Sequence, residues 1–129
     1  MSDESSGAFP LRDMLGFTME TGDGRSTGRL TVDARHINPH GTVHGAVMFA
    51  LIDTAMGGAT MSIVEEGNWC ATVDITTRFL APCFGGELVA VATVRRAGRR
   101  IVHLDATVTD GDGKEYTAAT GVFAVIPAG

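Results

Sequence analysis

The strongest constraint on this chain is a long apolar segment with one acid at its centre. From Val43 to Val64 the residues are mostly apolar, with no proline. A bilayer is spanned by about 20 such residues. Asp53 stands near the middle, however, where a charge in lipid costs at least about 2.5 kcal/mol. The segment also contains polar residues, so we expect a buried core helix and no membrane span: His44, Thr54, Thr60 and Ser62.

This segment is thin as well as apolar. Small residues recur in it: Ala50, Ala55, Gly57, Gly58 and Ala59. We expect the helix to begin at Val43–His44, behind a cap at Thr42, and to end at residues 65–68. Because its apolar residues cover nearly every face, we expect it to be buried all round, with a sheet wrapped closely about it.

Alternating polar and apolar residues predict strands on both sides of the helix. Before it we expect a short helix at 9–14, strands at 17–20 and 28–34, and a loop at 36–41. After it, four antiparallel strands follow one another, at 69–80, 87–96, 101–109 and 115–126. The expected fold class is α+β, one long central helix wrapped by a five- to six-stranded antiparallel sheet. Residues 1–8 are expected to be a disordered tail and residues 9–129 a single domain.

One helix covers only one face of such a sheet. The other face and the sheet edges remain available to another chain, so we expect a homo-oligomer.

Charge and composition narrow the class of function. The net charge of −5 lacks the basic footprint of a nucleic-acid binder. The polar, acidic N-terminus is unlike a secretory signal, and we expect a cytoplasmic protein.

The histidine and cysteine spacings predict no metal site. His36, His40 and His44 are four residues apart, but Pro39 and Gly41 prevent the helix that would bring them together. Cys70 and Cys83 lack zinc-ligand spacing and have no evident neighbouring base, so we expect them to be packing residues.

Asp53 is the clearest candidate for a functional side chain. No other carboxylate lies between Asp33 and Glu65. An acid within an apolar helix is either paired or functional, because desolvating an unpaired carboxylate is expensive. Arg78 is a candidate structural partner, and we favour a catalytic role over that pairing.

The start of the helix is the second candidate. A helix N-terminus offers unpaired N–H groups and a partial positive charge. Gly45 would let a substrate carbonyl approach these groups as in an oxyanion hole, or would simply allow tight packing. Gly45 and Asp53 are separated by about 12 Å along a helix, too far to contact one carbon. If both act in one reaction, they come from different subunits.

The stretch NPHGTVHGAVMFALIDTAMGGA resembles the signature of hot-dog-fold thioesterases of the PaaI-like (phenylacetic acid degradation) group. Similar stretches follow at 71–74, 79–82, 85–88 and 98–100, so the resemblance runs from about Phe9 to Val125. Ala46 departs from the pattern, since the family usually has a second glycine there. The added methyl of Ala46 would narrow the acyl pocket, so the resemblance specifies the type of reaction better than it specifies the acyl group.

The resemblance implies a role for each motif residue. Asp53 corresponds to the catalytic carboxylate, as nucleophile or as general base on water. Gly45 corresponds to the residue whose N–H polarises the thioester carbonyl, and Asn38 to an amide that holds the lytic water or the carbonyl. His44 corresponds to a histidine that orients the loop and contacts the thioester region. Thr72 corresponds to a hydroxyl near the carboxylate of the other subunit, although an ordinary strand threonine explains it equally well.

Four arginines flank one predicted turn, and they suit the phosphates of coenzyme A: Arg95, Arg96, Arg99 and Arg100. The alternative is a solvated hairpin. Phe79 is expected among the residues that contact the substrate.

The resulting hypothesis is an acyl-CoA thioesterase (EC 3.1.2.-) acting on aryl-acetyl, aryl or short-to-medium acyl-CoA. The alternatives are a non-catalytic acyl-CoA-binding protein and a hot-dog hydratase or dehydratase. We expect no cofactor beyond the coenzyme A of the substrate, no nucleic-acid or membrane partner, and a homotetramer built as a pair of dimers.

Overall fold

The structure, a computed structural model, describes residues 7–129. The expected disordered tail, residues 1–8, lies outside the described residues except for its last two. The elements in chain order are α1 (Pro10–Leu15), β1 (Thr18–Gly22), β2 (Arg25–Thr31), a 3₁₀ turn (Ala34–His36), α2 (Gly45–Met61), β3 (Trp69–Phe79), β4 (Glu87–Ala97), β5 (Ile101–Thr109) and β6 (Glu115–Ile126).

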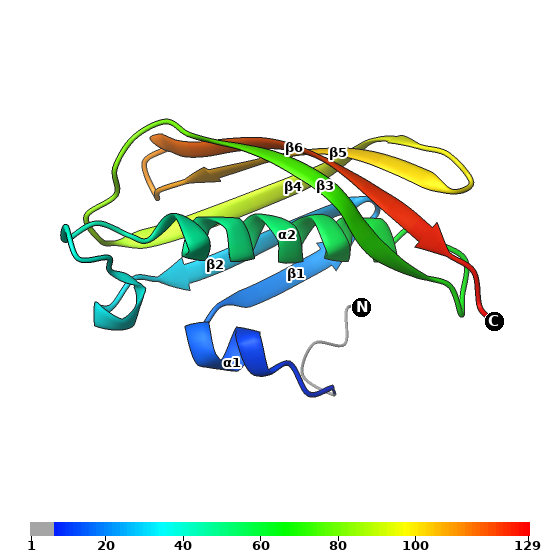
Figure 1. Ribbon diagram of the computed structural model, residues 1–129, viewed down its shortest axis with the longest axis horizontal. Helices are drawn as coiled ribbons and strands as arrows, with labels where there is room; N and C mark the ends of the chain where they lie inside the picture. The colour runs from blue at the N-terminus through cyan, green and yellow to red at the C-terminus, as the bar shows by residue number, and fades with distance from the viewer. Residues whose placement is uncertain (1–6) are drawn as a thin grey trace.

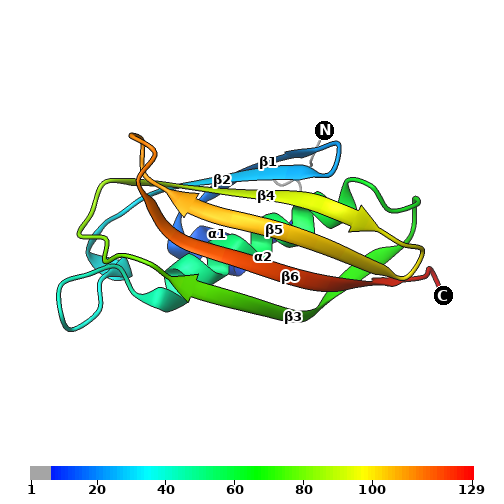
Figure 2. The ribbon, with the colours of Figure 1, turned by 90° about the horizontal axis from the view of Figure 1, so that it is seen from above.

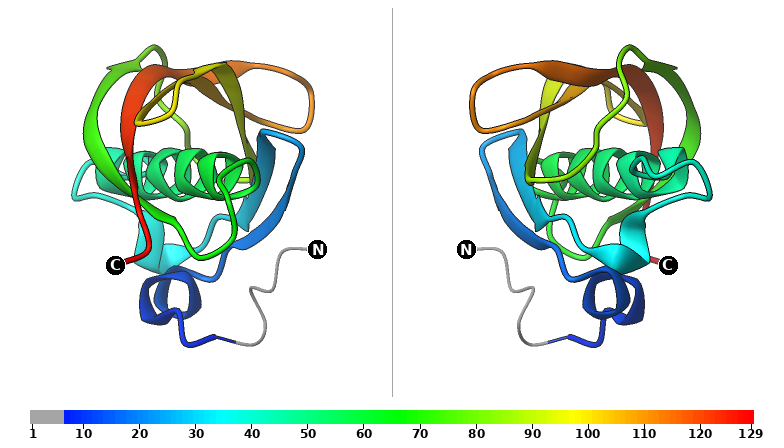
Figure 3. Two further views of the ribbon diagram at one scale, coloured as in Figure 1. Left: turned by 90° about the vertical axis from the view of Figure 1, so that its right-hand side faces the viewer. Right: turned by 90° about the vertical axis from the view of Figure 1, so that its left-hand side faces the viewer.

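The strands form one antiparallel sheet that curves around α2. Its order is β1-β2-β4-β5-β6-β3, and Figure 2 shows this order from above. The end-on views of Figure 3 show the sheet arching over one side of the helix, with α1 on the opposite side. The α+β layout with a single central helix is therefore confirmed.

The order of the strands in the chain is not their order in the sheet. β4 pairs with β2, whereas β3 pairs only with β6 and forms an edge of the sheet. The segment between β3 and β4 consequently crosses from one side of the sheet to the other (Figure 1). It passes the start of α2, where the Val43 N–H donates to the Cys83 carbonyl oxygen at 2.8 Å.

Several expected boundaries were wrong. β2 ends at Thr31 because Asp33 leaves the strand to cap the 3₁₀ turn, its carboxylate accepting from the Arg35 N–H at 3.0 Å. The cap of α2 is His44 and not Thr42, since His44 Nδ1 accepts from the Ala46 N–H at 2.9 Å. The helix also ends earlier than expected, at Met61. Within residues 7–129, no helix has the length and apolar character required to cross a membrane.

The core lies between α2 and the concave face of the sheet. Seven apolar helix residues are buried against it: Val47, Met48, Leu51, Ile52, Ala55, Met56 and Ala59. The expectation that the helix is buried all round was wrong, because the sheet leaves one stripe uncovered. Phe49 is 40% exposed and Asp53 is only partly buried. We call Ala46, Phe49 and Asp53 the open face of α2.

Glycines set how closely the sheet approaches the helix. A Cβ built on Gly58 of α2 would lie 2.9 Å from the Thr21 hydroxyl oxygen of β1. A Cβ on Gly121 of β6 would lie 2.5 Å from Met56 Sδ and 3.3 Å from Ile75 Cγ1. The expected close wrapping of a thin helix is confirmed at these positions.

We predict that Gly121→Ala lowers the free energy of unfolding by about 1–3 kcal/mol, because the buried Met56 must move in a packed core. Urea unfolding followed by circular dichroism measures the change. The matched control is Gly22→Ala in β1, where an added Cβ meets nothing within 4 Å. Equal stability of the two variants would contradict the packing argument.

Candidate active site

The N-terminus of α2 presents an unpaired backbone donor. His44 occupies the cap position, and its own N–H donates to the His36 carbonyl oxygen at 2.8 Å. The Ala46 N–H is already satisfied by His44 Nδ1. Within residues 7–129, the Gly45 N–H has no hydrogen-bond partner. A carbonyl or anion placed there would meet this donor and the positive end of the helix dipole.

Asn38 organises the loop that leads into the helix. Its Oδ1 accepts from the His40 and Thr42 N–H groups, at 2.9 and 3.2 Å, and its Nδ2 donates to Thr42 Oγ1 at 2.9 Å. Because an amide nitrogen carries two hydrogens, one Nδ2 hydrogen remains for a ligand. The Asn38 side chain thus mainly stabilises the loop. Its remaining Nδ2 hydrogen is the one that can contact a water or a substrate carbonyl.

His36 is a residue of this region for which the sequence suggested no role beyond a rejected metal site. It is fully buried, and its Nδ1 accepts from the Asp33 N–H at 2.9 Å. Nε2 therefore carries the proton and donates to the Leu15 carbonyl oxygen at 2.7 Å. This histidine joins the C-terminal end of α1 to the loop that positions His44. His36 is buried whereas His40 is exposed, and the sequence pattern of a loop does not reveal this difference.

Asp53 lies on the open face of α2 beside the edge strand β3. Thr72 Oγ1 donates to Asp53 Oδ1 at 2.7 Å. No ion pair joins Asp53 to Arg78 or to another residue within the part of the chain that the structure describes. The hydroxyl expected near the carboxylate of another subunit thus belongs to the same chain as the acid. Both residues meet within one chain because β3 runs alongside α2.

Cys70 lies on β3 beside Gly57, which is one turn of α2 beyond Asp53. Its thiol is half-buried and approaches the Gly57 carbonyl oxygen, with Sγ at 3.8 Å. Burial raises the pKa of the Cys70 thiol, and the negative charge of Asp53 raises it further. The thiol is therefore protonated at neutral pH, which argues against a nucleophilic role.

A cavity of about 280 Å³ opens at the N-terminus of α2. Phe79 lies against Gly45, since a Cβ built on that glycine would be 3.2 Å from Phe79 Cζ. The structure thus brings two of the expected site residues together. The other residues that line the cavity are Thr42, Val43, Met48, Leu80, Ala81, Pro82, Cys83 and Thr117.

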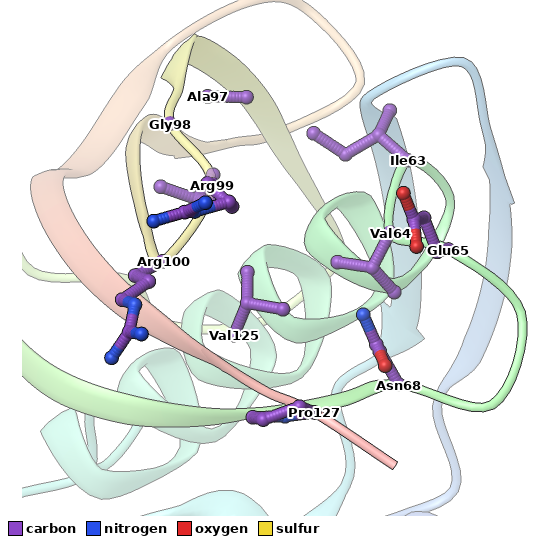
Figure 4. A pocket seen from close by; sticks show the side chains of 11 residues that line it. Ile63, Val64, Glu65, Asn68, Ala97, Gly98, Arg99, Arg100, Val125 and Pro127 are labelled. Atoms are coloured by element: carbon purple, nitrogen blue, oxygen red, sulfur yellow. The ribbon is translucent and has the colours of Figure 1, made fainter.

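A second cavity, of about 620 Å³, lies beyond the C-terminal end of α2. Arg99 and Arg100 line it from the turn between β4 and β5, facing Ile63, Glu65 and Asn68 (Figure 4).

The four arginines expected to bind phosphate are therefore divided, with two lining this cavity and two outside it. Arg95 forms an exposed ion pair with Asp105, Nε to Oδ2 at 3.4 Å, and Arg96 is exposed on β4 outside the cavity. Within one chain, Arg99 and Arg100 lie at the opposite end of α2 from Gly45.

The geometry divides the chemistry between two places on one helix. Gly45 offers a donor for a developing negative charge, and Asp53 offers a carboxylate oriented by a hydroxyl. At about 1.5 Å per residue these groups are separated by about 12 Å, so one chain does not place both on one carbonyl carbon. The Gly45 N–H of one helix and the Asp53 carboxylate of a second helix would suit acyl transfer if the two helices faced each other.

Comparisons with known proteins agree with this chemistry. The model of the Thioesterase superfamily matches residues 40–117. The chain is 32% identical over 100 residues to the acyl-coenzyme A thioesterase PaaI of Escherichia coli, covering 77% of this chain and 69% of that protein. The solved structure of that PaaI superimposes with a TM-score of 0.85 and 28% identity, over 93% of this chain and 86% of that one.

Two further solved structures are similar over nearly the whole chain. The conserved protein PA5202 from Pseudomonas aeruginosa has a TM-score of 0.90 at 28% identity, covering 97% of this chain and 100% of that one. The thioesterase HI1161 from Haemophilus influenzae has a TM-score of 0.86 at 27% identity, covering 92% and 83%.

The electrostatic effect of Asp53 on Cys70 generates a prediction that does not depend on activity. Asp53→Asn removes the negative charge that disfavours the thiolate, so the pKa of Cys70 should fall. Alkylation of Cys70 by iodoacetamide, quantified by mass spectrometry across pH, should then proceed at lower pH than in the wild type. Asp74→Asn, an exposed carboxylate of the same strand, is the control and should leave the profile unchanged. An identical profile for Asp53→Asn would show that the two groups do not interact.

Proposed function

Because this chain belongs to the Thioesterase superfamily, we propose that it hydrolyses acyl-CoA thioesters to a free acid and coenzyme A. One observation carries the assignment of residues: α2 presents an unpartnered Gly45 N–H at its start and an acid held by Thr72 further along. The hot-dog fold of the structural neighbours and the identification of PaaI and HI1161 as thioesterases support the reaction class.

The Gly45 N–H acts on the carbonyl oxygen. As the thioester carbonyl becomes tetrahedral, negative charge develops on its oxygen, and a fixed donor at a helix N-terminus stabilises that charge. Asn38 and His44 contribute by holding the loop and the first turn, so the donor is in place before the substrate arrives.

Asp53 attacks the carbonyl carbon or removes a proton from the water that does. In the first route an acid anhydride forms on the enzyme, the thiolate of coenzyme A leaves, and water cleaves the anhydride. In the second, water adds directly and the thiolate leaves from the tetrahedral intermediate. The Thr72 hydroxyl fixes one carboxylate oxygen at 2.7 Å and leaves the other for the reaction. A single turnover in ¹⁸O-water distinguishes the routes, because only the first labels the carboxylate.

The complete site lies between two copies of the chain. The open face of α2 and the unpaired side of β3 lie together, and β3 exposes large apolar residues, with Trp69 at 55% and Val73 at 56%. A second copy placed there would cover these side chains and bring its own α2 N-terminus towards Asp53. We expect two such dimers to form a tetramer.

The second cavity suits the phosphates of coenzyme A. Arg99 and Arg100 line it and have no ion-pair partner among residues 7–129, whereas Arg95 is held by Asp105. Guanidinium groups grip phosphate through paired N–H donors, so Arg99 and Arg100 are the proposed contacts.

Asp53→Asn should lower kcat by about 10²- to 10⁴-fold, the range that a positioned acid or base contributes. Asn38→Ala should cost less, because the loop keeps its backbone hydrogen bonds. Release of free coenzyme A from a panel of acyl-CoAs, detected with a thiol reagent, gives the rates. Asp112→Asn, in the exposed turn before β6, is the control and should retain full activity.

The same panel separates this function from its alternatives. Binding of acyl-CoA without thiol release, unchanged by Asp53→Asn, would indicate a binding protein. Addition of water to an enoyl-CoA would indicate a hydratase. Either result would refute the proposal.

Val73→Lys should separate the subunits and abolish activity together, because it places a charge in the proposed interface. Light scattering after gel filtration should show a mass falling towards the 13.5 kDa of one chain. Thr18→Lys, on the exposed edge strand β1 at the other side of the sheet, is the matched control. A fully active monomer would contradict a site shared between subunits.

A further inference from the structure

The cavity at the N-terminus of α2 contains one polar side chain without a partner. Most of its lining is apolar, and the polar side chains are those of Thr42, Cys83 and Thr117. The Thr42 hydroxyl accepts from Asn38 Nδ2, and the Cys83 thiol approaches the Gly85 carbonyl oxygen with Sγ at 3.4 Å. Thr117 is fully buried, yet its Oγ1 has no hydrogen-bond partner within residues 7–129.

The position of Thr117 connects it to the proposed reaction centre. It lies on β6 directly opposite Phe79 of β3, and Phe79 in turn lies against Gly45. Side chains that face each other across two strands have Cβ atoms about 4.5–5.5 Å apart. An acyl group whose carbonyl oxygen meets the Gly45 N–H therefore has Thr117 in the wall of the same cavity.

A buried unpaired hydroxyl gives such a cavity a chemical preference. Burying a hydroxyl without a partner costs free energy, and a ligand oxygen that reaches it recovers that cost. A site built to pair a substrate oxygen also rejects the analogue without that oxygen, because the protein group is again left unpaired. A threonine hydroxyl both donates and accepts, so a hydroxyl or a keto oxygen on the acyl group would serve.

We propose that Thr117 is a specificity-determining residue that favours small acyl groups bearing a hydrogen-bonding oxygen over hydrocarbon acyl groups of the same shape. The inference rests on the proposed function and deepens it by naming the acyl class. The cavity of about 280 Å³ has room for a short chain or a single ring.

The test compares matched acyl-CoAs that differ in one oxygen. The probe pairs are 3-hydroxybutanoyl-CoA against butanoyl-CoA and 6-hydroxyhexanoyl-CoA against hexanoyl-CoA, which place the oxygen at two depths. In the wild type, kcat/KM should be about tenfold or more higher for the hydroxylated member of at least one pair. Thr117→Val should remove this ratio by slowing the hydroxylated substrate alone, and Thr117→Ser should retain it.

Thr77→Val is the matched control. Thr77 Oγ1 is also buried without a partner, but Thr77 does not line the cavity, so the ratio should persist in this variant. The thermal midpoint of Thr117→Val should equal or exceed that of the wild type, since the change removes an unpaired buried group. A purely structural role would instead lower the midpoint and slow both members of a pair alike.

Two results would overturn the inference: equal kcat/KM within both pairs in the wild type, or an unchanged ratio in Thr117→Val. The first needs no variant, so the test holds even if Thr117→Val does not fold. Hydrolysis without discrimination refutes only the role of Thr117, whereas no thiol release from any acyl-CoA refutes the proposed function itself.

Discussion

Close contact between α2 and the concave face of the sheet is the constraint on which the rest of this structure depends. The sheet curves tightly because the facing positions lack bulk, at Gly58 on the helix and at Gly121 on β6. The helix is held at both ends as well: Val43 bonds to the Cys83 carbonyl at its start, and the Gly24 N–H donates to the Ser62 hydroxyl at its end. A helix fixed along its length and at both ends is a rigid support for reactive groups.

Rigidity of α2 explains how one element can carry both halves of the proposed chemistry. The unpaired N–H of Gly45 exists because the chain enters the helix through a capped turn. The cost of placing the Asp53 carboxylate on this helix is lowered because the sheet leaves the open face uncovered and Thr72 supplies a hydrogen bond. The same uncovered stripe lies next to the free edge of β3. The proposed second copy would cover both, and would thereby complete the core and the reaction centre.

Much of the fold was predictable from the sequence, and the failures have local causes. β5 and β6 match their expected bounds at both ends, and in β5 the period-two pattern reports burial directly. The strand order was not predictable, since nothing in the pattern of β3 states that its partner is β6. Side-chain caps were also missed, at His44 and Asp33, where geometry and not hydrophobicity decides. Asp53 stood out because a lone acid contrasts with its apolar neighbours, whereas Thr117 did not, because a threonine in a strand is ordinary until its hydroxyl is found without a partner.

The crossing of the chain between β3 and β4 has a consequence for how the protein matures. β3 follows α2 directly in the sequence, but β6, the one strand that pairs with it among residues 7–129, comes after both β4 and β5. Long-range pairing of this kind is slow, because a large loop must close before any contact stabilises it. The hydrogen bond from Thr72 to Asp53, on which the proposed reaction depends, is therefore secured only when β6 has docked on β3 and the sheet is whole.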